Sequence, residues 1–81
     1  MRMLDTDREQ SVRVLQFYLT TKEAKEFRDA LNKLLSDPEA NEHFHIFAED
    51  MSRECSCSII TPGKLAKSDY TDVERRIFNE K

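Results

Sequence analysis

The chain is poor in the residues that build flexible loops and cross-linked scaffolds. Its 81 residues include one glycine, two prolines, two cysteines and no tryptophan. A single glycine cannot build the glycine-rich loops that cradle phosphates and dinucleotides, and two cysteines are too few for a disulfide framework. We therefore expect both cysteines to be reduced thiols. Little glycine and proline also leaves little room for linkers, so residues 11–81 are expected to form a single domain.

Long apolar runs and a strong charge imbalance are also missing. No run approaches the roughly 18 residues that a membrane span needs, and Met1–Asp5 lack the apolar block of a secretory signal. We therefore expect a cytoplasmic protein with no membrane partner. Charged residues make up 36% of the chain, yet acids and bases alternate and the net charge is only -3. Neither half offers the basic face that a phosphate backbone requires, so no nucleic-acid partner is expected.

The first ordered element is predicted to be a strand. Residues 1–10 are mostly polar and have no apolar period, so we interpret them as a mobile lead-in. The segment Val12–Leu19 is rich in β-branched and aromatic residues and has the length of a strand. Alternate residues of a strand point to opposite faces, which separates the two sets of side chains. The residues expected in the core are Leu15, Phe17 and Leu19.

A helix is predicted directly after this strand. Thr20 stands three residues before Glu23, the spacing of a capping box in which each residue satisfies a backbone amide of the other. Pro38 disfavours helical geometry at Asp37 and should end the helix there. The apolar positions recur at steps of three and four and would form the buried stripe. These positions are Ala24, Phe27, Leu31, Leu34 and Leu35.

The centre of the chain has the pattern of a hairpin. Two apolar stretches, at about 42–48 and 55–61, are separated by a polar loop of suitable length. The Pro62-Gly63 pair that follows suits the central positions of a type II turn, since proline fixes φ and glycine tolerates a positive φ.

The last element is predicted to be a short helix at about 69–78. Thr71 and Glu74 again have the capping-box spacing, and apolar residues line one side of the segment. The predicted order is therefore β-α-β-β-α. Such an order is typical of an α+β fold, with a small, mostly antiparallel three-stranded sheet and two helices packed on one face.

The hairpin also carries possible metal ligands. His43 and His45 on one strand, with Cys55 and Cys57 on the next, could supply two imidazoles and two thiolates to a tetrahedral zinc ion. If paired residue numbers sum to an even value, these side chains share a face; if the sum is odd, the histidines and cysteines lie on opposite faces. The odd register separates polar from apolar residues better, so burial should select it. We therefore expect no metal or other cofactor, and a zinc module remains the alternative function.

No pattern in the sequence indicates catalysis. A catalytic cysteine–histidine pair is not expected, because the odd register places the two residue types on opposite faces of the hairpin. The sequence also contains no nucleophile elbow or phosphate loop. No catalytic residue is therefore assigned, and the protein is not expected to be an enzyme. What remains is an apolar sheet face away from the helices, which would collect Val12, Val14, Tyr18, His45, Phe47 and Ile60.

Exposed apolar patches of this kind commonly mark contact surfaces. We therefore expect a protein partner or a homodimer. The residues predicted to bind the partner are those of this face together with the acidic hairpin loop: Val14, Tyr18, His45, Phe47, Glu49, Asp50, Glu54 and Ile60.

The hairpin of His43–Asp50 and Cys55–Ile59 resembles one found in small bacterial immunity proteins that neutralise polymorphic toxins. The shared features are a histidine-containing strand, an acidic loop and a short returning strand. The resemblance implies a cytosolic binder that occludes a toxin. It also implies that Glu49, Asp50 and Glu54 would form an acidic rim around the contact.

Overall fold

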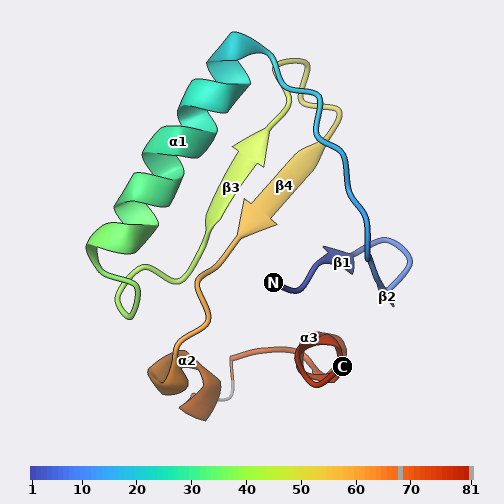
Figure 1. Ribbon diagram of the computed structural model, residues 1–81, viewed down its shortest axis with the longest axis vertical. Helices are drawn as coiled ribbons and strands as arrows, with labels where there is room; N and C mark the ends of the chain where they lie inside the picture. Colours follow the sequence, from blue (N-terminus) through green and yellow to red (C-terminus); the bar gives the residue numbers. More distant parts are fainter. Residues whose placement is uncertain (68, 81) are drawn as a thin grey trace.

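The computed structural model describes residues 1–67 and 69–80. This part of the chain forms strands and helices in the order β1 (Leu4–Asp5), β2 (Gln10–Ser11), α1 (Thr21–Ser36), β3 (Phe44–Phe47), β4 (Glu54–Cys57), α2 (Pro62–Ala66) and α3 (Asp72–Phe78). The α+β class is confirmed (Figure 1). The predicted three-stranded sheet is wrong, because the strands pair as two separate two-stranded sheets, β1 with β2 and β3 with β4. None of the described helices has the length and hydropathy to cross a membrane.

Helix α1 forms where the sequence predicts it. The Thr20 hydroxyl accepts a hydrogen bond from the Glu23 N–H at 3.1 Å, and the Glu23 carboxylate accepts one from the Thr20 N–H at 2.8 Å. Both halves of the predicted capping box are therefore present. The helix ends at Ser36, immediately before Asp37 and Pro38, as expected from the effect of proline on the preceding residue.

Strands β3 and β4 pair in the predicted register. Phe44 lies opposite Cys57 and Ile46 lies opposite Cys55, so paired residue numbers have an odd sum. Helix α1 covers the face that carries these residues, and the Phe27 ring meets the Phe44 ring edge-on with centroids 5.7 Å apart. Burial alternates along both strands, and His45 and Ser56 on the opposite face are exposed.

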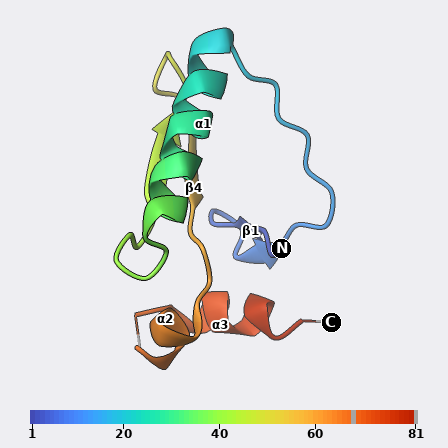
Figure 2. The same cartoon turned by 60° about the vertical axis from the view of Figure 1, so that its left-hand side comes forward.

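The strand predicted at Val12–Leu19 does not form. The segment runs in extended form from β2 to α1, on the same side of the hairpin as α1 and beyond the edge of β4 (Figures 1 and 2). The expected core residues are exposed, with Leu15 at 49%, Phe17 at 53% and Leu19 at 44%. A high β-propensity favours a strand only where a neighbouring strand supplies hydrogen bonds and packing, and here none does.

The first eleven residues hold a small hairpin that the interpretation of residues 1–10 as a lead-in did not foresee. Its strands β1 and β2 pair antiparallel. The Arg2 guanidinium donates hydrogen bonds to the carbonyls of Ile77, at 3.0 Å, and Glu80. In return, the Arg76 guanidinium donates to the Glu9 carbonyl at 2.7 Å. The two ends of the described chain are therefore held side by side by arginine side chains.

The type II turn predicted at Pro62-Gly63 is wrong. These residues open helix α2, in which proline takes the first helical position and Gly63 has no positive φ. The Thr61 hydroxyl caps the helix by accepting from the Lys64 N–H at 3.1 Å. Proline suits both a turn and a first helical turn, and the threonine cap decides between them.

Helix α3 begins with the predicted capping box of Thr71 and Glu74. The sequence predicts that this helix packs beside α1 on one face of the sheet, and that prediction is wrong. Helices α2 and α3 instead lie beyond one end of the β3–β4 hairpin (Figures 1 and 2). Helix α1 contacts β3, so the layered part of the molecule is one helix on two strands.

A buried lysine fastens α2 to the hairpin. Lys64 is 7% exposed, and its ammonium group donates to the carbonyls of Asn41 at 2.7 Å, Ile59 at 3.0 Å and Glu42 at 3.3 Å. These carbonyls belong to the segments that enter β3 and leave β4. One side chain thus satisfies backbone groups from both segments and fixes where the chain turns into α2.

The substitution Lys64→Met should lower the free energy of unfolding by about 1.5–3 kcal/mol, because it leaves three inward-facing carbonyls without their charged donor. Chemical denaturation monitored by circular dichroism would measure the loss. Lys67→Met, at the exposed end of the same helix, removes the same charge and should change stability little. Equal effects of the two substitutions would show that the ammonium contacts contribute nothing specific.

Candidate functional site

The open face of the β3–β4 hairpin is the first candidate surface. We define it as His45 and Phe47 of β3 with Glu54 and Ser56 of β4, the residues that alternate with the helix-facing set. The His45 and Phe47 rings stack with centroids 6.2 Å apart. The His45 Nδ1 lies 3.5 Å from the Glu54 carboxylate. The result is a small aromatic surface, with Phe47 39% exposed, bordered by one contact between an imidazole and a carboxylate.

The structure divides the predicted binding residues among three places, the third being the hairpin loop that carries Glu49 and Asp50. His45, Phe47 and Glu54 lie together on the open face, and Ile60, 44% exposed, follows β4. Val14 and Tyr18 do not join this face, because the segment that carries them is not a strand of the sheet. The continuous apolar face expected within one chain is therefore absent.

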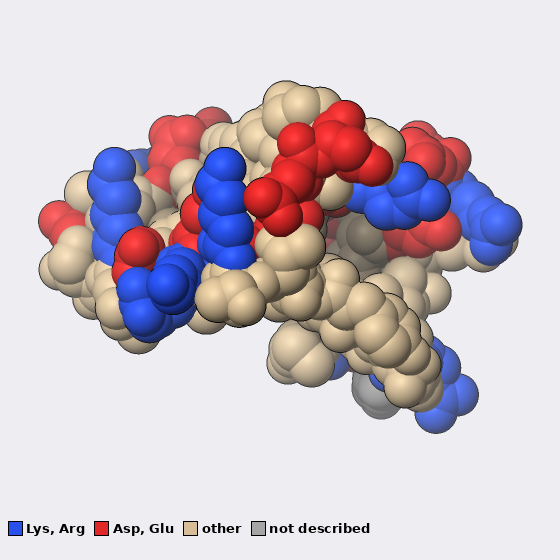
Figure 3. All heavy atoms as spheres, turned by 90° about the horizontal axis from the view of Figure 1, so that it is seen from above, with Lys and Arg blue, Asp and Glu red and all other residues tan. Residues whose placement is uncertain are grey.

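The extended segment Val12–Leu19 is the second candidate surface. Val14 is 85% exposed and Tyr18 is 86% exposed. Arg13 is the one charged residue between positions 11 and 19, although charged residues make up 36% of the chain. Seen from above, acidic and basic side chains are interspersed over the molecule, and an uncharged ridge projects on the side where Figure 1 places the segment (Figure 3). An exposed segment with high β-propensity and little charge is typical of a strand that pairs with another strand.

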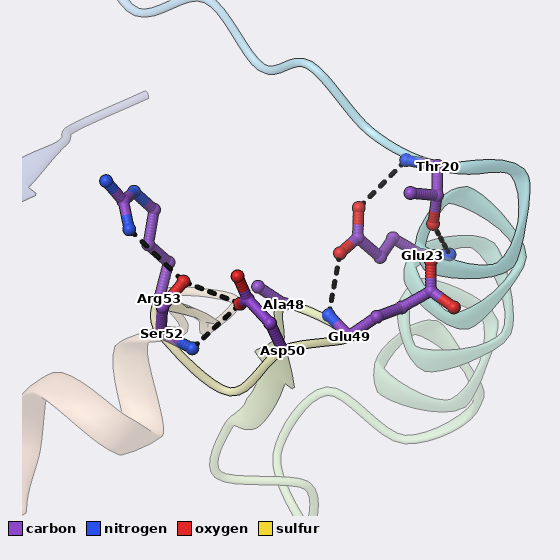
Figure 4. Close-up of a pocket in the computed structure, with 7 residues that line it drawn as sticks. All are labelled: Thr20, Glu23, Ala48, Glu49, Asp50, Ser52 and Arg53. Atoms are coloured by element: carbon purple, nitrogen blue, oxygen red, sulfur yellow. Dashed lines mark hydrogen bonds between the residues drawn. The ribbon is translucent and has the colours of Figure 1, made fainter.

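The acidic hairpin loop forms its own local structure. The Asp50 carboxylate accepts from the Ser52 N–H at 2.9 Å and from the Ser52 hydroxyl at 2.6 Å (Figure 4). These bonds hold the pKa of Asp50 below its ordinary value. They also support Met51 in a left-handed conformation with φ of 64°. Asp50 therefore stabilises the turn of the loop, a role that the sequence analysis does not predict.

Beside this loop lies a shallow depression of about 490 Å³, and Glu23 forms part of its wall (Figure 4). In addition to the cap at Thr20, the Glu23 carboxylate accepts from the Glu49 N–H at 3.0 Å. Hydrogen bonds from the Thr20 and Glu49 amides lower the pKa of Glu23. The spacing of Thr20 and Glu23 reveals the cap, but no local pattern reveals the bond to a loop 26 residues away.

The register between β3 and β4 determines whether the four predicted zinc ligands share a face. The thiols of Cys55 and Cys57 lie half-buried on the helix-facing side, whereas His43 and His45 are exposed on the other side. The four-ligand arrangement is therefore not formed, and the part of the chain that the structure describes holds no group of three or more candidate ligands. The predicted segregation of thiols from imidazoles is confirmed.

Burial, and secondarily the neighbouring Cys55, raises the pKa of Cys57 to about 11. The thiol is therefore protonated at neutral pH, and a protonated thiol is a poor nucleophile. Catalysis through this residue gains no support from its surroundings.

Comparisons with protein-family models, with curated proteins and with solved structures find no match to this chain.

The carboxylate of Glu23 should make stability depend on pH. A lowered folded-state pKa means that the stabilisation is fully present above the ordinary glutamate value of about 4.3 and is lost as the pH falls through the folded-state value. Glu23→Gln should therefore lower the melting temperature at pH 7, and the difference from the unsubstituted chain should shrink in acid. The exposed Glu26→Gln substitution removes the same charge from the same helix and serves as the control. A difference that stays constant with pH would contradict the role of the carboxylate.

The thiol of Cys57 should react slowly. In a folded Cys55→Ser variant, burial still raises the pKa of Cys57. The rate at which iodoacetamide labels this thiol should therefore keep rising about tenfold per pH unit well above pH 9. In denaturant, the labelling rate of the same thiol should stop rising above its ordinary pKa of about 8.5. Mass spectrometry of the modified chain would follow both rates. Matching profiles in the folded and unfolded states would show that burial does not control this thiol.

Proposed function

We propose that this protein is a non-enzymatic binding domain whose exposed apolar surface is completed by another polypeptide chain. The observation that carries the proposal is the accessible surface of 6681 Å² for a chain of 9.6 kDa. A compact monomer of this mass exposes about 5,100 Å², so the chain exposes about 1,600 Å² in excess. The radius of gyration of 13.5 Å also exceeds the value of about 12 Å for a compact chain of this length.

Part of the exposed surface is apolar and belongs to definable elements. Within the described ranges, Leu34 and Ile77 are the large apolar side chains that are buried. Large apolar side chains remain exposed on both candidate surfaces, Phe47 on the open face and Val14 and Tyr18 on the extended segment. Burying apolar surface contributes roughly 25 cal/mol per Å², so covering these residues would be strongly favourable.

A polypeptide fits these surfaces better than other classes of ligand. The extended segment presents unpaired backbone groups, which another chain can satisfy by strand addition. On the face shown in Figure 3, acidic side chains interrupt the basic ones, which does not favour a nucleic acid. The depression beside the hairpin loop is shallow and open, unlike the enclosed sites that bind small molecules.

An immunity-type inhibitor would be one form of such a binder, and its acidic rim would comprise Glu49, Asp50 and Glu54. Two of these carboxylates already interact within the chain, Asp50 with Ser52 and Glu54 with His45. The rim therefore gives weaker support than the apolar surfaces do. Action in the cytoplasm remains a prediction from the sequence.

Binding should depend on the exposed apolar side chains. We expect Phe47→Ser and Val14→Ser each to weaken retention of a partner chain by the tagged protein at least about tenfold, because each removes an exposed anchor and few intramolecular contacts. Affinity capture with mass spectrometry would quantify retained chains, including untagged copies of the protein itself.

Leu65→Ser is the matched control, since Leu65 is 40% exposed on α2 and lies on neither surface. It should leave capture unchanged, and thermal melts should show that all three variants remain folded. Retention of the same chains by the unsubstituted protein and by both variants would refute the proposed function.

A further inference from the structure

The segment Val12–Leu19 runs in extended form, and beyond Val12 its backbone has no hydrogen-bonded partner among the described residues. From Arg13 to Leu19, no N–H or carbonyl takes part in a backbone hydrogen bond with any described residue. The aromatic ring of Phe17 touches Phe27 of α1, with centroids 5.6 Å apart, so the segment is held at the rim of the helix-facing side. Both of its ends are anchored, by β2 and by the cap of α1. It is therefore presented in extended form and not collapsed onto the body.

The outer edge of β4 offers the complementary groups. The Ala48 N–H donates to the Arg53 carbonyl at 2.9 Å, in the same register as the β3–β4 pairs. Because hydrogen-bonded pairs alternate along an antiparallel ladder, Cys55 and Cys57 bond to β3, whereas the N–H and carbonyl of Ser56 point outward. These outward groups accept a further strand without disturbing the hairpin.

The segment of the same chain is poorly placed to fill this edge. Beside β4 it would run parallel to β3, and the α1 connection between them would cross in front of the sheet from right to left in Figure 1. That path is a left-handed β-α-β crossover, whereas about 98% of such connections are right-handed. A segment from another molecule carries no such restriction.

We propose that the partner is a second copy of this chain, and that each copy adds its Val12–Leu19 segment to the outer edge of the other's β4. This inference rests on the proposed function and names its partner. The contact is isologous, since the same two elements meet twice around a two-fold axis. It gives the unpaired backbone of both elements its hydrogen bonds.

The exposed area of each copy is more than a dimer needs. A stable interface buries about 800 Å² on each partner, and each copy exposes about 1,600 Å² more than a compact monomer. Addition of the segment to β4 also brings Val14 and Tyr18 beside the sheet that carries His45 and Phe47. The apolar face that the sequence predicts within one chain is then assembled from two.

The mass of the purified chain tests the proposal. Sedimentation velocity from nanomolar to hundreds of micromolar should show a monomer–dimer equilibrium. The double substitution Leu15→Pro with Gln16→Pro removes two successive N–H groups, one of which must face the partner strand. It should raise the dissociation constant at least about tenfold, which equals about 1.4 kcal/mol. The control, Leu15→Ala with Gln16→Ala, removes the same side chains but retains both N–H groups, and should dimerise at least tenfold more tightly than the proline variant.

Hydrogen exchange locates the contact. The amide of Ser56 and alternate amides of residues 13–19 should gain protection as the concentration rises, and this gain should be absent in the proline variant. A chain that stays monomeric at every concentration overturns the proposal, as does a dimer that is equally tight with proline and with alanine. If the monomeric chain still captures a different protein through Phe47 and Val14, the proposed function stands and only the second copy is rejected. If it captures nothing, both fail.

Discussion

The register between β3 and β4 is the constraint on which the other features depend. With Phe44 opposite Cys57, Phe44, Ile46 and both cysteines face α1, whereas His45 and Phe47 face outward. A shift by one residue would bring the histidines and cysteines onto the same face, so that either the imidazoles lie against Phe27 or the thiols lie in water. The same register fixes which amides of β4 point away from β3. It therefore determines the buried thiols, the separated metal-ligand candidates and the edge open to another strand.

Polar contacts hold the described chain together where apolar burial is slight. The Glu23 carboxylate links the start of α1 to the hairpin loop. The Lys64 ammonium links α2 to the segments that enter β3 and leave β4. Arginines join the first hairpin to α3. Such contacts fix geometry, but each contributes only modestly because it replaces bonds to water. A chain held this way has shape without a large core, which is consistent with a domain completed by a partner.

Local patterns predicted the elements that depend on neighbouring residues. The capping boxes at Thr20 and Thr71 and the stop before Pro38 are satisfied within a few residues of the chain. Val12–Leu19 shows where such reasoning fails. Its composition favours a strand, but a strand requires a partner, and the partner's position is a property of the whole fold. Of the candidate site, the open face of His45 and Phe47 followed from alternation, whereas the separation of Val14 and Tyr18 from it did not.

The sequence by itself determined α1, α3, the hairpin register and the segregation of thiols from imidazoles, because these follow from capping, helical or strand periodicity and the cost of burying polar groups. Only the tertiary structure decided that Glu23 and Lys64 bind distant backbone groups. It also decided that the most strand-like segment of the chain stands unpaired. These outcomes depend on contacts between residues far apart in the chain, and such contacts leave no periodic signal in the sequence.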